Sequence, residues 1–114
     1  MKAKTPKEVL IAARYIIDTV GFCKKATARD RQGNITSCNE GNLSNIDAVC
    51  ISGALQLVNT GCYERGIAIN ILADICSANY HRDFISFNDH RDTTKEEVLK
   101  VFDLAIEEAN SHDQ

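Results

Sequence analysis

The sequence predicts a mainly α, compact single domain of about four helices around a central buried helix, with a small two-stranded β-ribbon. Three observations support this class. Apolar residues recur at intervals of three and four along most of the chain, which is the period of helices that bury one face. Residues 47–59 carry one charged side chain and must therefore be covered by other elements. A chain of 114 residues has the length of one domain with a real core, so we expect residues 1–114 to form one unit.

The first helix is predicted to begin at Thr5 and to end at Gly21. Thr5 is a favourable cap, Pro6 fits the first helical position because its missing N–H is not needed there, and Glu8 completes a capping box. Gly21 is typical of the C-terminal end of a helix. The apolar residues between these two ends form one buried stripe: Val9, Leu10, Ala13, Ile16, Ile17 and Val20.

A short two-stranded ribbon is predicted near residues 24–38. Its turn is the segment Asp30–Asn34, in which Gly33 can take the positive φ that such turns require. The chain on either side of this turn is expected to supply the two strands. A polar loop at residues 39–45 then leads to the central helix.

The central helix is predicted within residues 47–59. Gly53 and Ala54 are small enough to let another backbone approach this helix closely. Cys50 is its only chemically unusual group. We therefore expect a packing role for the run Cys-x-x-Gly-Ala-Leu that begins at Cys50.

Three further segments complete the predicted fold. Apolar spacing predicts a helix over residues 63–78. The last helix opens at Thr94–Glu97 with a second capping box, and residues 110–114 are expected to form a polar, frayed tail. Between these helices, segment 81–92 has three side chains that can anchor it on the core: Phe84, Ile85 and Phe87.

The charge and composition argue against several classes of protein. A net charge of −3 and a pI near 5.5 disfavour general binding to nucleic acids or membrane surfaces, which usually needs a basic excess. No apolar run approaches the roughly 20 residues of a membrane span, and the N-terminus does not resemble a signal peptide. The five cysteines are odd in number and widely spaced, which favours buried thiols over a disulfide framework. We expect a cytoplasmic protein without a cofactor.

Two segments carry candidate binding residues. Positively charged residues gather on the predicted ribbon: Lys24, Lys25, Arg29 and Arg31. They could form a solvated strand edge, or a docking patch for a phosphate-bearing ligand or an acidic partner surface. Segment 81–92 holds two His-Arg-Asp triplets. Its candidate residues for ligand or partner binding are His81, Arg82, Asn88, Asp89, His90 and Arg91.

Cysteine catalysis is the alternative function. A thiolate at Cys50 would need a base, and His81 or His90 is the candidate, oriented by a neighbouring aspartate. Against this hypothesis, the neighbours of Cys50 are apolar, and no known nucleophile signature surrounds it. A zinc site made from Cys23, Cys38, Cys50 and a histidine lacks the closely paired ligands of zinc motifs, so no metal site is predicted.

Taken in order, the motifs of the chain resemble those of an uncharacterised family of small bacterial and bacteriophage proteins, a domain of unknown function. The family motifs are T-P-x-E-V-L, a Gly-aromatic-Cys step, D-x-x-G, C-x-x-G-A-L, W-N-D and T-x-x-E-V-L. Here they correspond to Thr5 to Leu10, Gly21 to Cys23, Asp30 to Gly33, Cys50 to Leu55, Phe87 to Asp89, and Thr94 to Leu99.

The resemblance covers nearly the whole chain, with departures in one segment. Phe87 stands in place of tryptophan, and His90-Arg91 replaces a small residue and proline. The resemblance implies a bacterial or bacteriophage setting and supports Cys23, Cys50, Asn88 and Asp89 as residues that the fold uses. Asn88-Asp89 is expected to cap and turn the chain into the last helix.

We therefore expect a non-enzymatic binding protein. The reasons are the small size and full globularity of the chain and its lack of a cofactor motif or a convincing catalytic constellation. In the setting that the resemblance implies, we expect a phage-encoded accessory or host-defence-inhibiting factor that engages a host protein or a small phosphate-bearing ligand. A host protein or a second copy of the chain is the expected partner, rather than nucleic acid or a membrane. A homodimer could form through an exposed helical stripe, and a small enzyme using Cys50 with His81 or His90 is the alternative.

Overall fold

The structure is a computed structural model that describes residues 2–112, with side chains for residues 2–110. It contains five α-helices, one 3₁₀ helix and one small antiparallel sheet among the described residues, which confirms the predicted mainly α class with a two-stranded sheet. In chain order the elements are α1 (Pro6–Val20), β1 (Ala28–Arg29), the 3₁₀ helix η1 (Glu40–Asn45), β2 (Ala48–Val49), α2 (Ile51–Leu57), α3 (Cys62–Tyr80), α4 (Phe84–Asp89) and α5 (Lys95–His112).

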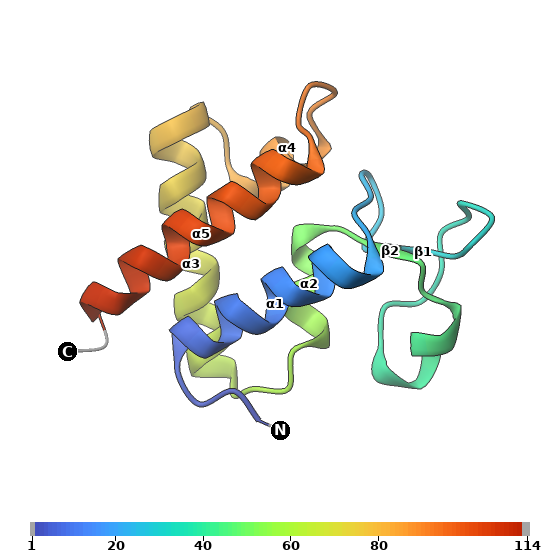
Figure 1. The fold of residues 1–114 in the computed structure, drawn as a ribbon, viewed down its shortest axis with the longest axis horizontal. Coiled ribbons are helices and arrows are strands. Elements are labelled where there is room, and N and C mark those ends of the chain that lie inside the picture. The colour runs from blue at the N-terminus through green and yellow to red at the C-terminus, as the bar shows by residue number, and fades with distance from the viewer. Residues whose placement is uncertain (1, 113–114) are drawn as a thin grey trace.

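The helices pack around one core. Figure 1 shows α1 and α5 side by side and crossing α3, while β1, β2 and η1 lie together at one end of the molecule. Helix α1 contacts α2, α3, α5 and β2, and the short α2 contacts α1, α4 and β2. The largest fully buried side chains come from all of these layers: Phe87, Phe102, Leu10, Ile17, Ile51, Leu55 and Leu72.

The two predicted capping boxes differ in their second hydrogen bond. In α5 the box is reciprocal, because Glu97 N donates to Thr94 Oγ1 and Thr94 N donates to Glu97 Oε1. In α1 the cap is as predicted, with Glu8 N donating to Thr5 Oγ1. The Glu8 carboxylate, however, accepts from Lys4 N at 2.6 Å rather than from the cap residue. The box therefore closes one residue earlier than predicted.

The predicted ribbon has a different second strand. The turn at Asp30–Asn34 forms, with Gly33 at φ 86°, but only a single bridge joins Arg29 to Ile35 beyond it. β1 pairs instead with β2, in the register Ala28 to Val49 and Arg29 to Ala48. The two sides of the turn therefore meet only through this bridge and the bond from Thr36 N to Ala28 O, and the sheet partner of β1 is β2 rather than the chain after the turn.

The central helix is shorter than residues 47–59, and the reason is Val49. Val49 N donates to Gly21 O, and Val49 O accepts from Cys23 N, both at 3.0 Å. These bonds hold Val49 in an extended conformation, so α2 begins only at Ile51. The helix ends at Leu57. The prediction that this helix is buried is confirmed on the face formed by Ile51, Gly53, Ala54 and Leu55.

The second half of the chain follows the prediction with three changes. The helix expected at 63–78 spans Cys62–Tyr80, and segment 81–92 contains the additional helix α4. Phe87 anchors α4, with its ring centroid 4.4 Å from that of Tyr80, whereas Ile85 is 58% exposed and does not serve as an anchor.

The last helix also differs from the prediction at its end. α5 extends to His112, which includes part of the segment expected as a tail, and residues 113–114 lie outside the described residues. Across the part of the chain that the structure describes, no helix combines the length and apolarity needed to cross a membrane.

Candidate functional site

Gly53 is the position at which α2 touches the strand region. A Cβ atom added to Gly53 would lie 2.1 Å from the backbone oxygen of Thr27, which is far inside van der Waals contact. The same Thr27 oxygen accepts a hydrogen bond from Cys50 N at 3.2 Å. Cys50 Sγ in turn accepts from Gly53 N at 3.2 Å and so caps α2. In the Cys-x-x-Gly pattern, therefore, the cysteine thiol caps α2 and the glycine lets the backbone of Thr27 approach the helix closely.

Asn88 is a buried clamp between three segments. Its side chain is on α4, and the residue is 3% exposed. Asn88 Oδ1 accepts from Ile51 N at 2.9 Å, and Asn88 Nδ2 donates to Cys23 O at 3.2 Å. The amide thereby satisfies a backbone donor in the first turn of α2 and a backbone acceptor after α1. The expected role in turning the chain into the last helix was wrong, because Asn88 acts on α2.

The two predicted binding segments meet beside this clamp. Lys25 N donates to Asp89 Oδ1 at 2.8 Å, and Lys25 has a positive φ of 63°. Lys24 Nζ donates to the backbone oxygens of His90 at 2.6 Å and Arg91 at 3.2 Å. Residues of the predicted basic patch thus fasten the end of α4 to the segment before β1.

A cleft of about 200 Å³ lies at this junction, and its lining is mostly apolar. Three of the candidate residues line it: Cys50, Asn88 and Asp89. Asp89 Oδ1 accepts from Lys25 N and Asn88 Nδ2, whereas Asp89 Oδ2 has no hydrogen-bond partner among the described residues. The cleft therefore offers apolar walls and a carboxylate oxygen that can still accept a hydrogen bond, beside the hydroxyl groups of Thr27 and Ser52. Its other lining residues, which the sequence analysis did not single out as a site, are Ala26, Thr27, Ser52, Phe84 and Ile85.

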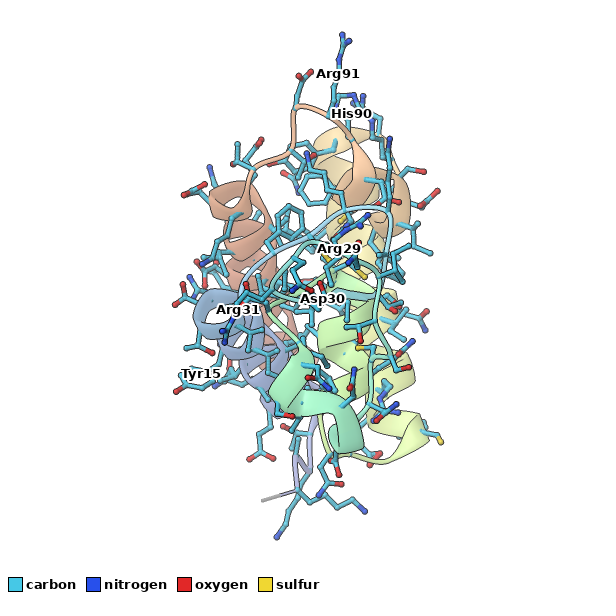
Figure 2. All side chains as sticks on the ribbon, turned by 90° about the vertical axis from the view of Figure 1, so that its right-hand side faces the viewer. Tyr15, Arg29, Asp30, Arg31, His90 and Arg91 are labelled. Carbon is cyan, nitrogen blue, oxygen red and sulfur yellow. The ribbon has the colours of Figure 1, made fainter. Side chains whose placement is uncertain are left out.

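The remaining basic candidates do not form one patch. Arg29 donates to the backbone oxygens of Gly33 and Lys24, so its guanidinium supports the turn. In Figure 2, His90 and Arg91 lie at one end of the molecule, and Arg31 lies well away from them. A single phosphate group cannot engage residues separated in this way.

Arg82 and His81 lie at the end of α3. Arg82 Nη1 donates to Tyr80 O at 3.2 Å, and His81 is an exposed C-terminal cap with φ 57°. His90 Nδ1 accepts from Asp92 N at 3.2 Å. Neither histidine lines the cleft that contains Cys50.

The environment of Cys50 favours the neutral thiol. Burial raises the pKa of the Cys50 thiol, the amide of Gly53 partly opposes this effect, and the carboxylate of Asp89 adds to it. Neither of the predicted bases, His81 and His90, lines the cleft beside this thiol. A protonated thiol that accepts a structural hydrogen bond is a poor nucleophile.

We expect Cys50 to react slowly with iodoacetamide at neutral pH. The five thiols are free, and Cys62 is exposed, so Cys62 should be alkylated first and Cys50 much later. Because its pKa is raised, the rate at Cys50 should grow by about tenfold per pH unit through mildly alkaline pH. Time-resolved peptide mass spectrometry of the native protein measures both rates, and unfolded protein is the control. Alkylation of Cys50 as fast as Cys62 at neutral pH would contradict this description of the site.

The other two thiols near Cys50 also hydrogen-bond to the backbone. Cys23 Sγ donates to Ala26 O, and Cys38 Sγ donates to Gly53 O. Burial raises the pKa of Cys23 to about 11 and raises that of Cys38 as well. Within residues 2–112, no group of three or more His, Cys, Asp or Glu side chains has an arrangement that could hold a metal ion.

Comparison with known proteins identifies a family and no function. The model of DUF6197, described as a family of unknown function, matches residues 1–108 of the chain. This match confirms the resemblance to an uncharacterised family. Neither the curated proteins nor the solved structures contain a match.

Proposed function

We propose that this chain, which belongs to the family of unknown function DUF6197, is a non-enzymatic binding protein that holds one apolar side chain of a protein partner in the cleft. The observation that carries the proposal is the cleft itself. It is open, mostly apolar and bordered by Ile85, which is 58% exposed. An exposed aliphatic side chain beside an apolar cleft is a typical feature of a protein-binding surface.

The size of the cleft favours a protein partner. Its volume of about 200 Å³ is below the range of about 300–1,000 Å³ that is usual for small-molecule sites. It has room for one aliphatic side chain. A phosphate-bearing ligand receives less support, because Lys24 and Arg29 already donate to backbone oxygens.

The carboxylate of Asp89 indicates how the partner would be oriented. Asp89 Oδ2 can accept a backbone N–H from the residue that enters the cleft, while Phe84 and Ile85 contact its side chain. This arrangement suits a leucine-like residue in an accessible segment of the partner. An acidic residue in the same place would meet the Asp89 carboxylate and be repelled.

The proposal includes the setting in which the protein acts. Five free thiols support a reducing compartment such as the cytoplasm. The net charge of −3 supports a protein partner over nucleic acid. The resemblance described above adds a bacterial or bacteriophage cell, in which the chain would be an accessory or host-defence-inhibiting factor that engages a host protein. The cysteine-dependent enzyme receives no comparable support, since neither His81 nor His90 lines the cleft.

Titration with a small leucine compound tests the proposal. We expect N-acetyl-leucine methylamide to bind the native protein weakly and saturably, as measured by amide chemical shifts, and N-acetyl-aspartate methylamide to bind at least about tenfold more weakly. The substitution Ile85→Asp should weaken binding of the leucine compound by a similar factor.

The matched control is Tyr63→Asp. Tyr63 is also exposed and helical, but it does not line the cleft. This variant should bind the leucine compound as the native protein does. Equal binding of the two compounds, or an equal effect of the two substitutions, would contradict the proposed site.

A further inference from the structure

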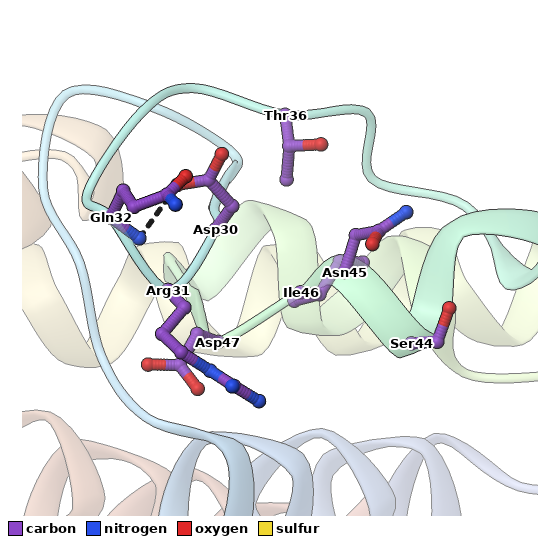
Figure 3. Close-up of a pocket in the computed structure, with 8 residues that line it drawn as sticks. All are labelled: Asp30, Arg31, Gln32, Thr36, Ser44, Asn45, Ile46 and Asp47. Atoms are coloured by element: carbon purple, nitrogen blue, oxygen red, sulfur yellow. Dashed lines mark hydrogen bonds between the residues drawn. The ribbon is translucent and has the colours of Figure 1, made fainter.

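We infer that a second pocket, next to η1, binds a basic amino acid. The pocket has a volume of about 540 Å³ and lies between the Asp30–Asn34 turn and the end of η1 (Figure 3). It shares no lining residue with the cleft, so this inference is independent of the proposed function. Its lining is predominantly polar: Asp30, Arg31, Gln32, Thr36, Ser44, Asn45, Ile46 and Asp47.

The turn side of this pocket is held by Asp30. Asp30 Oδ1 accepts from the backbone N–H groups of Gln32 at 3.0 Å and Asn34 at 2.9 Å, the first of which is drawn in Figure 3. Asp30 N also donates to Asn34 O at 2.8 Å. The second carboxylate oxygen of Asp30 has no hydrogen-bond partner among the described residues.

The η1 side is held by Asn42. Asn42 Nδ2 donates to Thr36 Oγ1 at 2.9 Å and to Ser37 O at 2.7 Å. Asn42 Oδ1 accepts from Asn45 Nδ2 at 2.7 Å. Although this region contains little regular secondary structure, both walls of the pocket are fixed by hydrogen bonds.

Three charged side chains that line the pocket have polar atoms without a hydrogen-bond partner among the described residues: Asp30, Arg31 and Asp47. Arg31 and Asp47 project to the same side of the pocket in Figure 3, and their side chains form no hydrogen bond or ion pair with another residue of the described chain. Arg29, two positions earlier, differs from Arg31 because its guanidinium already donates to two backbone oxygens. Together with Asp30, the lining thus presents two carboxylates and one guanidinium.

This charge pattern is the complement of a basic amino acid. Free arginine or lysine carries two cationic groups and one carboxylate. The planar guanidinium of Arg31 can hold the carboxylate of the ligand in a bidentate pair, while Asp30 and Asp47 receive its cationic groups. The volume of about 540 Å³ falls within the range of about 300–1,000 Å³ for small-molecule sites.

Calorimetric titration with L-arginine and L-lysine tests this inference. Two comparison ligands each lack one charge: agmatine has no carboxylate, and L-citrulline has a neutral side chain. At constant ionic strength we expect saturable binding of the two basic amino acids, with affinities about tenfold or more above those of agmatine and citrulline. The absence of saturable binding, or equal binding of all four compounds, would overturn the inference.

Two substitutions locate the binding. Arg31→Gln should abolish the preference for L-arginine over agmatine, and Asp47→Asn should weaken binding of L-arginine by about tenfold. Both residues are exposed, and circular dichroism checks that the variants are folded. The matched controls Arg91→Gln and Asp92→Asn change exposed residues that do not line the pocket, and they should bind as the native protein does. Native affinity in Arg31→Gln and Asp47→Asn would overturn the inference.

Discussion

Replacement of Gly53 by alanine is expected to lower the free energy of unfolding by about 2–3 kcal/mol. The added Cβ would lie 2.1 Å from the backbone oxygen of Thr27, so either α2 or the segment before β1 must move. Movement would also strain the hydrogen bond from Cys50 N to Thr27 O. Equilibrium unfolding in urea, followed by far-ultraviolet circular dichroism, measures the loss.

Gly66→Ala is the matched control for this prediction. Gly66 also lies within a helix, but a Cβ added there meets no atom within 4 Å. Because alanine is the better helix former, Gly66→Ala should raise the free energy of unfolding by about 0.5–1 kcal/mol. If both alanine variants shift stability in the same direction, the close approach at Gly53 does not explain the Cys-x-x-Gly motif.

Replacement of Asn88 by alanine is expected to cost about 3 kcal/mol of stability. The truncation leaves the backbone N–H of Ile51 and the backbone oxygen of Cys23 without their side-chain partner in a buried place. The control is Asn79→Ala, which removes an exposed amide that donates to Ile75 O and should change stability by less than about 0.5 kcal/mol. In thermal and urea unfolding, Asn88→Ala should therefore unfold at a clearly lower temperature and a clearly lower urea concentration than Asn79→Ala.

The conservative variant Asn88→Asp separates the two hydrogen bonds. Aspartate keeps an acceptor for Ile51 N but loses the donor to Cys23 O and places a second carboxylate beside Asp89. We expect it to be destabilised at neutral pH, with part of the loss recovered when the pH is lowered and the new carboxyl becomes protonated. A native-like stability for Asn88→Ala would contradict the role of Asn88 as a clamp.

The elements that were predictable from the sequence are those set by local signals. The caps at Thr5 and Thr94, the glycine after α1 and the three-to-four apolar spacing define α1 and α5 with few errors. The start of α2 was not predictable in this way. Val49 is extended because the segment after α1 binds its backbone, and local spacing carries no information about that long-range contact.

The candidate site was likewise predictable only where local sequence signals were sufficient. Residue type and the family motifs together drew attention to Cys50, Asn88 and Asp89, which line the cleft. The hydrogen bonds that join Lys24 and Lys25 to His90 and Asp89 link residues more than 60 positions apart. Sequence spacing therefore could not show that two proposed surfaces are one junction, or that several of their polar groups are already engaged within the fold.

The proposed binding surface is the cleft between the segment before β1, the start of α2, and α4. The most direct measurement is a map of the amide chemical shifts that N-acetyl-leucine methylamide changes in the native protein. The account predicts that the largest changes fall on residues 26–27, 50–52 and 84–89, which surround the cleft. Largest changes on the exposed face of α1, at Ile11 and Tyr15, or no saturable change on any residue, would contradict it.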